Sequence, residues 1–263
     1  MMTKLWALAD THLSFGTPDK KMDIFGDKWK DHPAKIEKNW RQIVGPDDIV
    51  LIAGDISWGK HIVDAMPDLE WIDKLPGRKI ISKGNHDYWW TSNSKMLKAM
   101  PSSIQFVNKS ALDIDEYSIA GTRLWDHITI NFGSKIDFQV NPKDTHPEPK
   151  TEEELAHNER IYESELVRLE LALSQLNQDK IKVAMVHYPP LSFDLKPSPT
   201  TLLLEKYNVD ICVFGHLHNV KPDIKLFDTN FRGIHYTLSS CDYLHFTPIE
   251  LKPSQHKSNI VSN

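Results

Sequence analysis

Five short polar clusters in this chain contain side chains that bind metal ions in proteins, and each follows a run of apolar residues. They are Asp10-Thr-His12, Gly54-Asp55, Gly84-Asn85-His86-Asp87, His187 and Gly215-His216-Leu-His218. Carboxylate, imidazole and amide groups without a thiolate suit iron, manganese, zinc or similar divalent ions. The sequence therefore predicts a metal site built from distant segments.

The spacing within the clusters indicates that they act together. A single Asp-x-His or His-x-His pair is usually a turn or a structural histidine, so no cluster is informative alone. Residues two apart on an extended segment point to the same side, so Asp10 can act with His12, and His216 with His218. Three glycines are expected to let the backbone turn tightly as it leaves a strand: Gly54, Gly84 and Gly215.

The order of these clusters resembles the motifs of the calcineurin-like metallophosphoesterase superfamily, and in particular its small bacterial predicted phosphohydrolases. The resemblance extends from Asp10 to His218, which is most of the chain. It implies two divalent transition-metal ions, manganese, iron or zinc. One ion would be bound by Asp10, His12, Asp55 and His218. The other would be bound by Asp55, Asn85, His187 and His216, with Asp55 bridging the two.

The resemblance also implies how a phosphoester would be cleaved. Two cations ~3.5–4 Å apart lower the pKa of a shared water and hold the phosphoryl oxygens, so the nucleophile would be a metal-bridging hydroxide. His86 follows the ligand Asn85 and would face the substrate, where it would stabilise or protonate the leaving oxygen. The alternative is a histidine that only braces the turn.

The second cluster departs from several branches of the superfamily. Serine/threonine phosphatases and dinucleotide hydrolases have Gly-Asp-x-x-Asp-Arg-Gly, whereas this chain has Gly54-Asp55-Ile-Ser-Trp58-Gly-Lys60. The carboxylate that orients the catalytic histidine in those branches is replaced by Trp58, so the partner of His86 stays open. Purple acid phosphatases have a tyrosine ligand at the same offset, and no tyrosinate-iron centre is expected here.

Candidates for substrate contacts carry weaker signals. Arg123 could hold a phosphate oxygen through two N–H donors, and a surface salt bridge is an equal alternative. Five aromatic residues beside the motifs could stack on a ring, although core packing is favoured for each: Trp29, Trp58, Trp89, Trp90 and Tyr188. Structural roles are expected for His235 and His245. Surface positions are expected for His32, His61, His127, His146, His157 and His256.

Apolar runs that end at the polar clusters predict the strands that position them: 5–9, 49–53, 79–82, 181–186 and 209–214. Helices are expected at 34–44, 69–75, 88–100 and 152–176, the last opened by the capping-box pair Thr151 and Glu154. Shorter strands are expected at 225–227, 233–238 and 245–249. With the resemblance, this alternation predicts an α/β protein: a layered α/β/β/α sandwich with mixed sheets and flanking helices, and a dinuclear metal site at the C-terminal ends of strands.

Length and composition set the remaining expectations. A chain of 263 residues predicts one domain over 1–252, with insertions at about 13–32 and 126–150 that border the site, and a frayed tail at 253–263. Cys212 and Cys241 have neither metal-binding nor disulfide spacing. The apolar N-terminal stretch is too short for a signal peptide, and no run approaches the ~18 apolar residues of a membrane span. A cytoplasmic location is expected.

The leading interpretation is a metal-dependent phosphohydrolase that acts on a small phosphodiester or phosphomonoester. A diester is slightly favoured because the second cluster lacks features of the monoester-specific branches. A nuclease is an alternative, but the net charge of −5 gives no basic field for nucleic acid. A non-catalytic binding scaffold is disfavoured because every candidate ligand and His86 are present. Nothing in the sequence indicates an oligomeric state.

Overall fold

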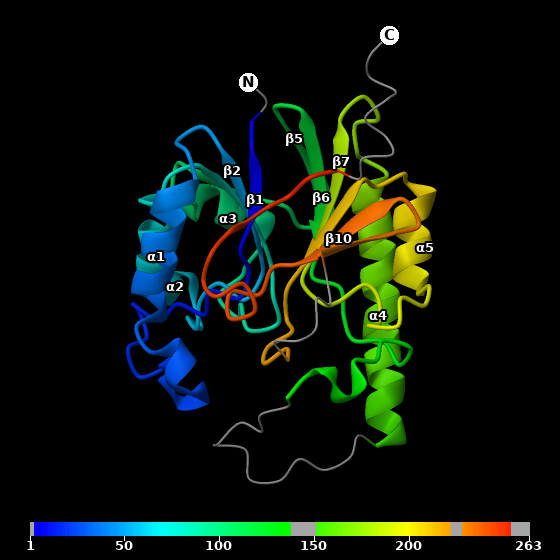
Figure 1. Ribbon diagram of the computed structural model, residues 1–263, viewed down its shortest axis with the longest axis horizontal. Helices are drawn as coiled ribbons and strands as arrows, with labels where there is room; N and C mark the ends of the chain where they lie inside the picture. The colour runs from blue at the N-terminus through cyan, green and yellow to red at the C-terminus, as the bar shows by residue number, and fades with distance from the viewer. Residues whose placement is uncertain (1–2, 138–150, 222–227, 254–263) are drawn as a thin grey trace.

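A computed structural model describes residues 3–137, 151–221 and 228–253. Two β-sheets pack face to face, and helices cover the outer face of each (Figure 1). α1 (His32–Ile43), α2 (Ile62–Asp73) and α3 (Asn93–Ala99) lie on one side, and α4 (Glu152–Leu173) and α5 (Pro199–Lys206) on the other. The expected α/β/β/α sandwich is therefore confirmed.

The first sheet has the strand order β11-β1-β2-β3-β4. Its strands are β1 (Leu5–Ala7), β2 (Ile49–Ala53), β3 (Arg78–Ser82), β4 (Ile104–Phe106) and β11 (Ile249–Glu250). β1 to β4 are parallel, and β11 pairs with β1 in the antiparallel direction. The parallel strands all direct their carboxyl ends to the same edge of the sheet.

The second sheet has the order β5-β6-β7-β8-β10-β9. Its strands are β5 (Ser110–Ile114), β6 (Tyr117–Thr122), β7 (Ile181–Val186), β8 (Ile211–Phe214), β9 (Asp228–Phe231) and β10 (Ile234–Leu238). The central four strands are parallel, while β5 and β9 are antiparallel at the two edges. Both sheets are mixed, as predicted.

The apolar core has three layers. Successive side chains of a central strand point to opposite faces of its sheet and so enter different layers. Along β2, Ile49, Leu51 and Ala53 enter the core between the sheets, whereas Val50 and Ile52 face the layer beneath α1 and α2. A strand that is buried on both faces must be apolar at every position, which explains the continuous runs in the sequence.

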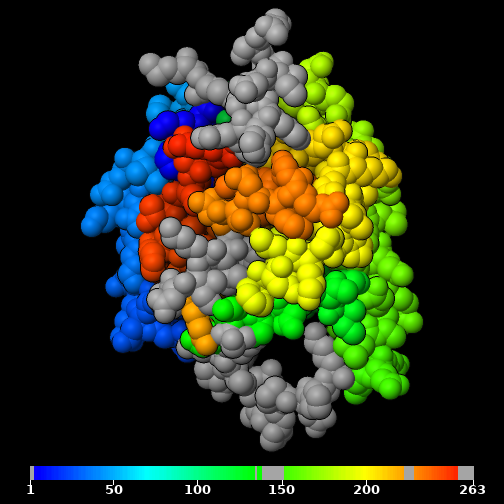
Figure 2. Space-filling model, turned by 45° about the vertical axis from the view of Figure 1, so that its right-hand side comes forward, coloured from blue at the N-terminus to red at the C-terminus, as the bar shows by residue number. Residues whose placement is uncertain are grey.

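The C-terminal segment joins the two halves of the sandwich. β10 pairs with β8 in the second sheet, Ser240 forms a bridge with Ala9, and β11 pairs with β1 in the first sheet. In Figure 2 this segment, coloured orange to red, lies across the surface between the blue and yellow parts of the chain. It carries residues to the edge where the polar clusters lie.

The short elements confirm some predictions and correct others. Thr151 and Glu154 form the predicted capping box at the start of α4. α2 begins at Ile62, seven residues earlier than expected, and contains Pro67 within it. α3 begins at Asn93 rather than at residue 88, because the preceding turn folds around the Asp87 carboxylate.

The prediction of a strand at 245–249 is wrong, because only its last residue, Ile249, lies in a strand. His245 and Phe246 have positive φ values of 50° and 59°, which end an extended conformation, and Phe246 turns into the core. β4, β5, β9 and α5 were not predicted. The expected strand at 225–227, residues 138–150 of the second insertion and 254–263 of the tail lie outside the described residues.

Among the described residues, no helix combines the length and the apolar character needed to cross a membrane.

The surface position expected for His32 is wrong, because this residue is buried. Its two ring nitrogens lie 3.1 and 3.0 Å from the carbonyl oxygens of Trp29 and Thr11. His32 therefore joins the irregular segment 13–32 to the loop after β1. Both cysteines are buried and free.

Candidate metal centre

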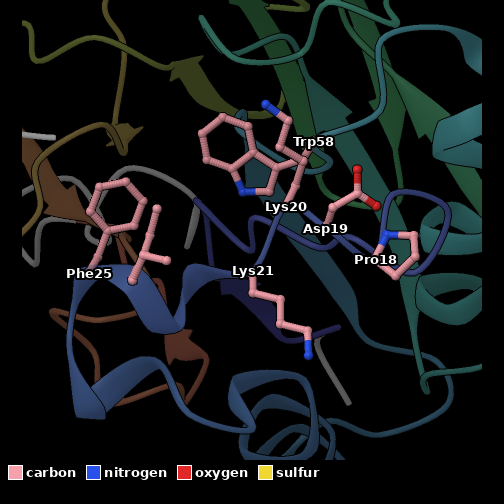
Figure 3. A pocket seen from close by; sticks show the side chains of 7 residues that line it. Pro18, Asp19, Lys20, Lys21, Phe25 and Trp58 are labelled. Carbon is pink, nitrogen blue, oxygen red and sulfur yellow. The ribbon is translucent and has the colours of Figure 1, made fainter. Parts of the chain in front are cut away.

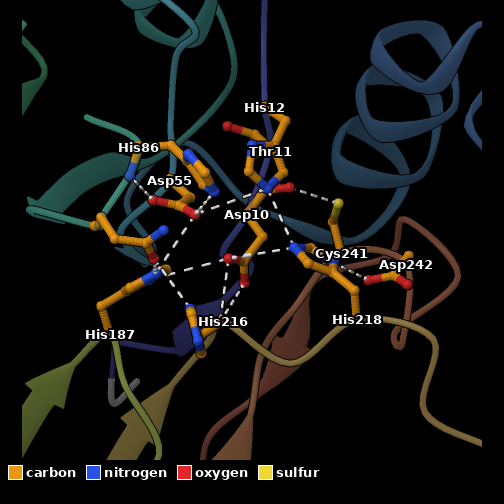
Figure 4. Close-up of polar contacts among 12 residues, drawn as sticks. Asp10, Thr11, His12, Asp55, His86, His187, His216, His218, Cys241 and Asp242 are labelled. Atoms are coloured by element: carbon orange, nitrogen blue, oxygen red, sulfur yellow. Dashed lines mark hydrogen bonds and ion pairs between the residues drawn. The ribbon is translucent and has the colours of Figure 1, made fainter. Parts of the chain in front are cut away.

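The predicted ligands follow five parallel strands at one edge of the sandwich (Figure 4). They are Asp10 and His12 after β1, Asp55 after β2, Asn85 after β3, His187 after β7, and His216 and His218 after β8. Open α/β sheets bind ligands where the carboxyl ends of such strands meet. Here both sheets contribute to one site.

Four of the candidate ligands are oriented by left-handed backbone conformations rather than by the pleat of an extended strand. The φ values of Asp10, His12, Asp55 and His216 are 57°, 44°, 52° and 72°. The expectation that paired ligands lie on extended segments is therefore wrong, because β1 ends at Ala7 and β8 at Phe214. Non-glycine residues with positive φ are strained and gather at functional sites.

The glycines of the motifs also act differently from the prediction. Gly54 has a φ of 90°, as a tight turn requires, and a Cβ there would lie 2.6 Å from Nδ1 of His187. Gly84 and Gly215 have no positive φ. They provide close approach, because a side chain would collide with Asp55 or with Asp10.

The residues Asn85, His187 and His216 form what we call the His187 cluster. Nδ1 of His187 donates to the carbonyl oxygen of Ala53 at 2.9 Å, and its Nε2 lies 3.5 Å from Oδ2 of Asp55. Oδ1 of Asn85 lies 2.7 Å from that Nε2 and 3.0 Å from Nδ1 of His216. The backbone bond fixes the ring so that Nε2 faces the centre.

The residues His12, His218 and Asp242 form the His218 cluster. Nε2 of His12 and Nε2 of His218 face each other at 3.1 Å. Nδ1 of His218 donates to Oδ1 of Asp242 at 2.8 Å, and Lys28 donates to Oδ2 at 2.6 Å. Lys28 also donates to Asn219 at 2.7 Å. Sequence analysis missed Asp242 and Lys28, because neither lies in a motif or at ligand spacing.

These groups fit divalent cations. Candidate ligand atoms lie within 4.8 Å of one another in two sets, Asp10 with His12 and His218, and Asp10 with Asp55 and His187. Oδ2 of Asp55 also lies 3.8 Å from Nε2 of His12, so this carboxylate faces both clusters. The Nδ1 atoms of His187 and His218 are engaged elsewhere, which leaves their Nε2 atoms available to a metal. Oxygen and imidazole donors match transition-metal preferences.

The pKa values of the buried acidic groups and of His187 also indicate that the centre favours bound positive charge. Burial raises the pKa of Asp10 to about 6. Burial also opposes ionisation of Asp55, but His187 and His12 hold the pKa of this carboxyl well below its ordinary value. Although burial works against it, Asp55 and Asp10 raise the pKa of His187 to about 9. The two carboxylates stabilise a proton on His187, and metal binding would release this proton.

Asp87, the last residue of the third motif, fixes two ligand loops together. Its fully buried carboxylate accepts hydrogen bonds from the backbone N–H groups of Asp55, Ile56 and Gly84 at 2.9, 2.9 and 2.8 Å. It also accepts one from Nε1 of Trp89 at 2.9 Å. Satisfied buried networks of this kind specify one geometry, so Asp87 positions Asp55 without reaching the centre.

His86 lies at the open side of the centre. Its side chain is 37% exposed, and its Nε2 lies 4.0 Å from Oδ2 of Asp55. Its ring lies 4.7 Å from that of Trp58, which stands where other branches have a carboxylate. Nδ1 of His86 has no hydrogen-bond partner among the described residues. His86 is therefore held by ring packing and by its backbone N–H, which donates to Asp55 at 2.8 Å.

The remaining candidates lie in the apolar cores or beside α4. The Arg123 guanidinium lies over Trp125 at 4.4 Å and 3.6 Å from Glu165, on the side of α4. Trp89 and Trp90 are buried in the core beneath α1 to α3. Tyr188 is buried in the core on the side of α4 and α5, with its ring 4.1 Å from that of His216.

The described residues of the two segments that were predicted to border the site, 13–32 and 126–137, include side chains that line cavities beside it. Segment 13–32 contributes Met22, Phe25 and Trp29 to a cavity that is also lined by His12 and His218. The described part of the second segment lines a separate cavity that includes His216.

Curated relatives match only part of the chain. Gene 66 protein of Mycobacterium phage L5 is 39% identical over 90 residues, which is 33% of this chain and 41% of the relative. Gene 66 protein of Mycobacterium phage D29 is 35% identical over 88 residues, with the same coverage of 33% and 41%. The aligned region thus spans about two fifths of the length of these relatives.

The fold has a counterpart among solved structures. The phosphopantetheinyl hydrolase PptH from Mycobacterium tuberculosis covers 97% of this chain and 98% of its own, with a TM-score of 0.50 and 15% sequence identity. At this identity the likeness concerns the fold. The family model described as calcineurin-like phosphoesterase matches residues 3–220, a span that contains all seven candidate ligands. The chain therefore belongs to the calcineurin-like phosphoesterase family.

Proposed function

We propose that this phosphoric ester hydrolase cleaves small phosphodiesters or phosphomonoesters with two divalent transition-metal ions, and that it favours diesters slightly. The observation that carries the proposal is the convergence of seven potential ligands from both sheets, with His86 beside them and partly exposed. Cations held there would provide a hydroxide nucleophile and would neutralise charge on the phosphoryl oxygens. The chain's own residues would hold the cations and contact the leaving oxygen.

The ligands have distinct positions in this proposal. Asp55 would bridge, because its Oδ2 faces both His12 and His187. Asn85 contributes a neutral carbonyl oxygen. This limits the negative charge of the centre and leaves it attractive to a phosphate group.

His86 would contact the oxygen of the leaving group. Burial lowers the pKa of His86 below its ordinary value of 6.5, so its ring is neutral at pH 7 and retains one N–H donor. A positioned donor stabilises the charge that develops on the leaving oxygen. Trp58 restricts the ring where a carboxylate partner is absent. Arg123 is a further candidate for substrate binding.

We also propose that residues 1–252 act as one domain, although the family match ends at residue 220. The support lies in Asp242, which contacts the ligand His218, and in β11, which completes the first sheet. Segments 13–32 and 126–150 would then be insertions that shape the substrate site.

The test is turnover by protein reconstituted with manganese, iron or zinc. The panel would contain nucleotide, lipid and sugar phosphoesters, together with a paired aryl phosphodiester and aryl phosphomonoester. A phosphopantetheinyl ester belongs in it because of the activity in the name of the structural counterpart. We expect about two metal ions per chain and metal-dependent hydrolysis. Full activity after exhaustive chelation would contradict the proposal.

A further inference from the structure

A cavity of about 170 Å³ opens beside the His218 cluster. Its polar lining consists of His12, His86, His218 and Asn219. Its apolar walls are Met22, Phe25, Trp29 and Trp58. The cavity therefore joins candidate metal ligands, and the residue proposed to face the leaving oxygen, to an aromatic wall. A group bonded to phosphorus at the centre would have this space beside it.

The walls of this aromatic cavity are held in place. Trp58 stacks on His12, with ring centroids 5.1 Å apart and planes 22° apart, and its Nε1 donates to the sulfur of Met22 at 3.4 Å. Trp29 is 1% exposed, and its ring meets that of His218 edge-on at 5.6 Å. A site formed in advance binds more tightly, because less ordering is needed on binding.

A second cavity of about 300 Å³ lies next to the first. Phe25 and Trp58 line both, so the two cavities adjoin at these side chains. Figure 3 shows the side chains that line the second cavity. Pro18 and Ile24 extend the apolar lining, and Asp19, Lys20 and Lys21 provide its charged part. This second cavity would accept substituents too large for the aromatic cavity.

We propose that the aromatic cavity binds a planar aromatic group in the organic part of the substrate, a specificity that rests on the proposed phosphoester hydrolysis. Aromatic rings stack on planar groups whatever the hydrogen-bonding pattern of the group. A sugar or glycerol group would gain little from these four apolar walls, because its hydroxyls could find partners only at the histidines and at Asn219. The site thus selects aryl or heteroaryl phosphoesters.

Non-hydrolysable phosphonates test this specificity without a leaving group. Phenylphosphonate and methylphosphonate present the same anionic head to the metals and differ in the group that would enter the cavity. Calorimetric titration of the manganese-loaded protein should show phenylphosphonate binding about tenfold or more tightly than methylphosphonate, as expected for one stacked ring.

Phe25→Ala should reduce this preference to about twofold or less, while methylphosphonate binds within about twofold of the wild-type affinity. Phe25→Leu should give an intermediate preference and guards against a folding defect of the alanine variant. Phe15→Ala is the matched control, because Phe15 lies on the same segment but is 46% exposed and packs against Trp71 at 5.6 Å. It should keep the full preference.

Equal binding of the two phosphonates by the wild-type protein would overturn the aromatic specificity and leave phosphoester hydrolysis standing. An equal loss of both affinities in Phe25→Ala and Phe25→Leu would also overturn it, since Phe25 would then act on the metal centre in general. Failure of both phosphonates to bind would count against the metal–phosphate site itself, and the inference would fall with it.

Discussion

The His187 cluster and the His218 cluster lie side by side but are fixed by different parts of the protein. His187 is fully buried, and its Nδ1 donates to a backbone carbonyl of β2, which belongs to the other sheet. The side chain of His218 is 26% exposed, and its Nδ1 donates to the side chain of Asp242, which Lys28 holds in turn. One cluster depends on the sheets, the other on side chains from segments outside them.

This difference predicts unequal sensitivity to substitution. A backbone carbonyl cannot be removed by changing its residue, so the orientation of His187 is protected by the fold. The orientation of His218 depends on one carboxylate and one ammonium group, both of which single substitutions remove. The His218 cluster also borders segment 13–32, so its geometry and the substrate space are linked.

Asp55→Asn should have the largest effect, because it changes the carboxylate that faces both clusters. Loss of the negative charge should lower metal occupancy at both and reduce turnover by on the order of 10³-fold or more. Elemental analysis and turnover on an aryl phosphoester measure the two effects. A variant that retains about two ions would show that Asp55 does not bridge.

His86→Ala should separate catalysis from metal binding in both clusters. None of the seven proposed ligands changes, so metal content should stay near normal while turnover falls by roughly 10²–10⁴-fold. An activated aryl ester needs little assistance at the leaving oxygen and should lose less than an alkyl ester. Metal depletion as severe as in Asp55→Asn, or full activity on both esters, would remove His86 from this role.

Asp242→Asn should distinguish the two clusters directly. We expect one of two metal-binding steps to weaken by roughly 10–100-fold, the usual effect of losing a partner that orients a histidine ligand. Lys28→Met should weaken the same step less, because Asp242 and His218 both remain. Metal titration followed by calorimetry measures each step.

Asp194→Asn is a suitable control for the loss of a lysine–aspartate pair, since Asp194 pairs with Lys196 at 2.8 Å in an exposed loop. It should leave both metal-binding steps unchanged. If Asp242→Asn weakens both steps equally, the clusters do not differ in the way that their partners suggest.

Asp68→Asn should have the smallest effect, on stability rather than on catalysis. Asp68 accepts hydrogen bonds from Ser57 and from the backbone of Phe15 at 2.7 Å, which ties segment 13–32 to the loop after β2. Burial raises the pKa of Asp68 from 3.8 to about 6, so the folded state favours its protonated form. This stabilisation is complete below about pH 4 and is lost as the pH rises through 6.

The free energy of unfolding of Asp68→Asn relative to wild type should therefore increase between pH 4 and 6, by on the order of 1–3 kcal/mol. Urea unfolding of both proteins at each pH measures it. The pKa values of Asp10 and Asp87 are also raised to about 6, but both residues are present in both proteins, so their contributions cancel in the difference. A difference independent of pH would show that Asp68 does not titrate in this range.

The central strands were predictable because burial on both faces leaves a continuous apolar run. β2 and β7 have the predicted bounds, 49–53 and 181–186. Edge strands such as β5 and β9 are only partly buried and carry no such run, so they were missed. The start of α3 was also unpredictable, because a tertiary contact of Asp87 determines the turn before it.

The sequence alone determined which side chains could bind metal, since the seven candidates lie in short motifs directly after apolar strands. Only the tertiary structure decided how they are aimed and what holds them. Left-handed conformations at Asp10 and Asp55 replace the extended spacing that was expected. The contact of Asp242 with His218 spans 24 residues, and that of Lys28 with Asp242 spans 214. Such contacts leave no local pattern, because they form only when the C-terminal segment folds back across both sheets.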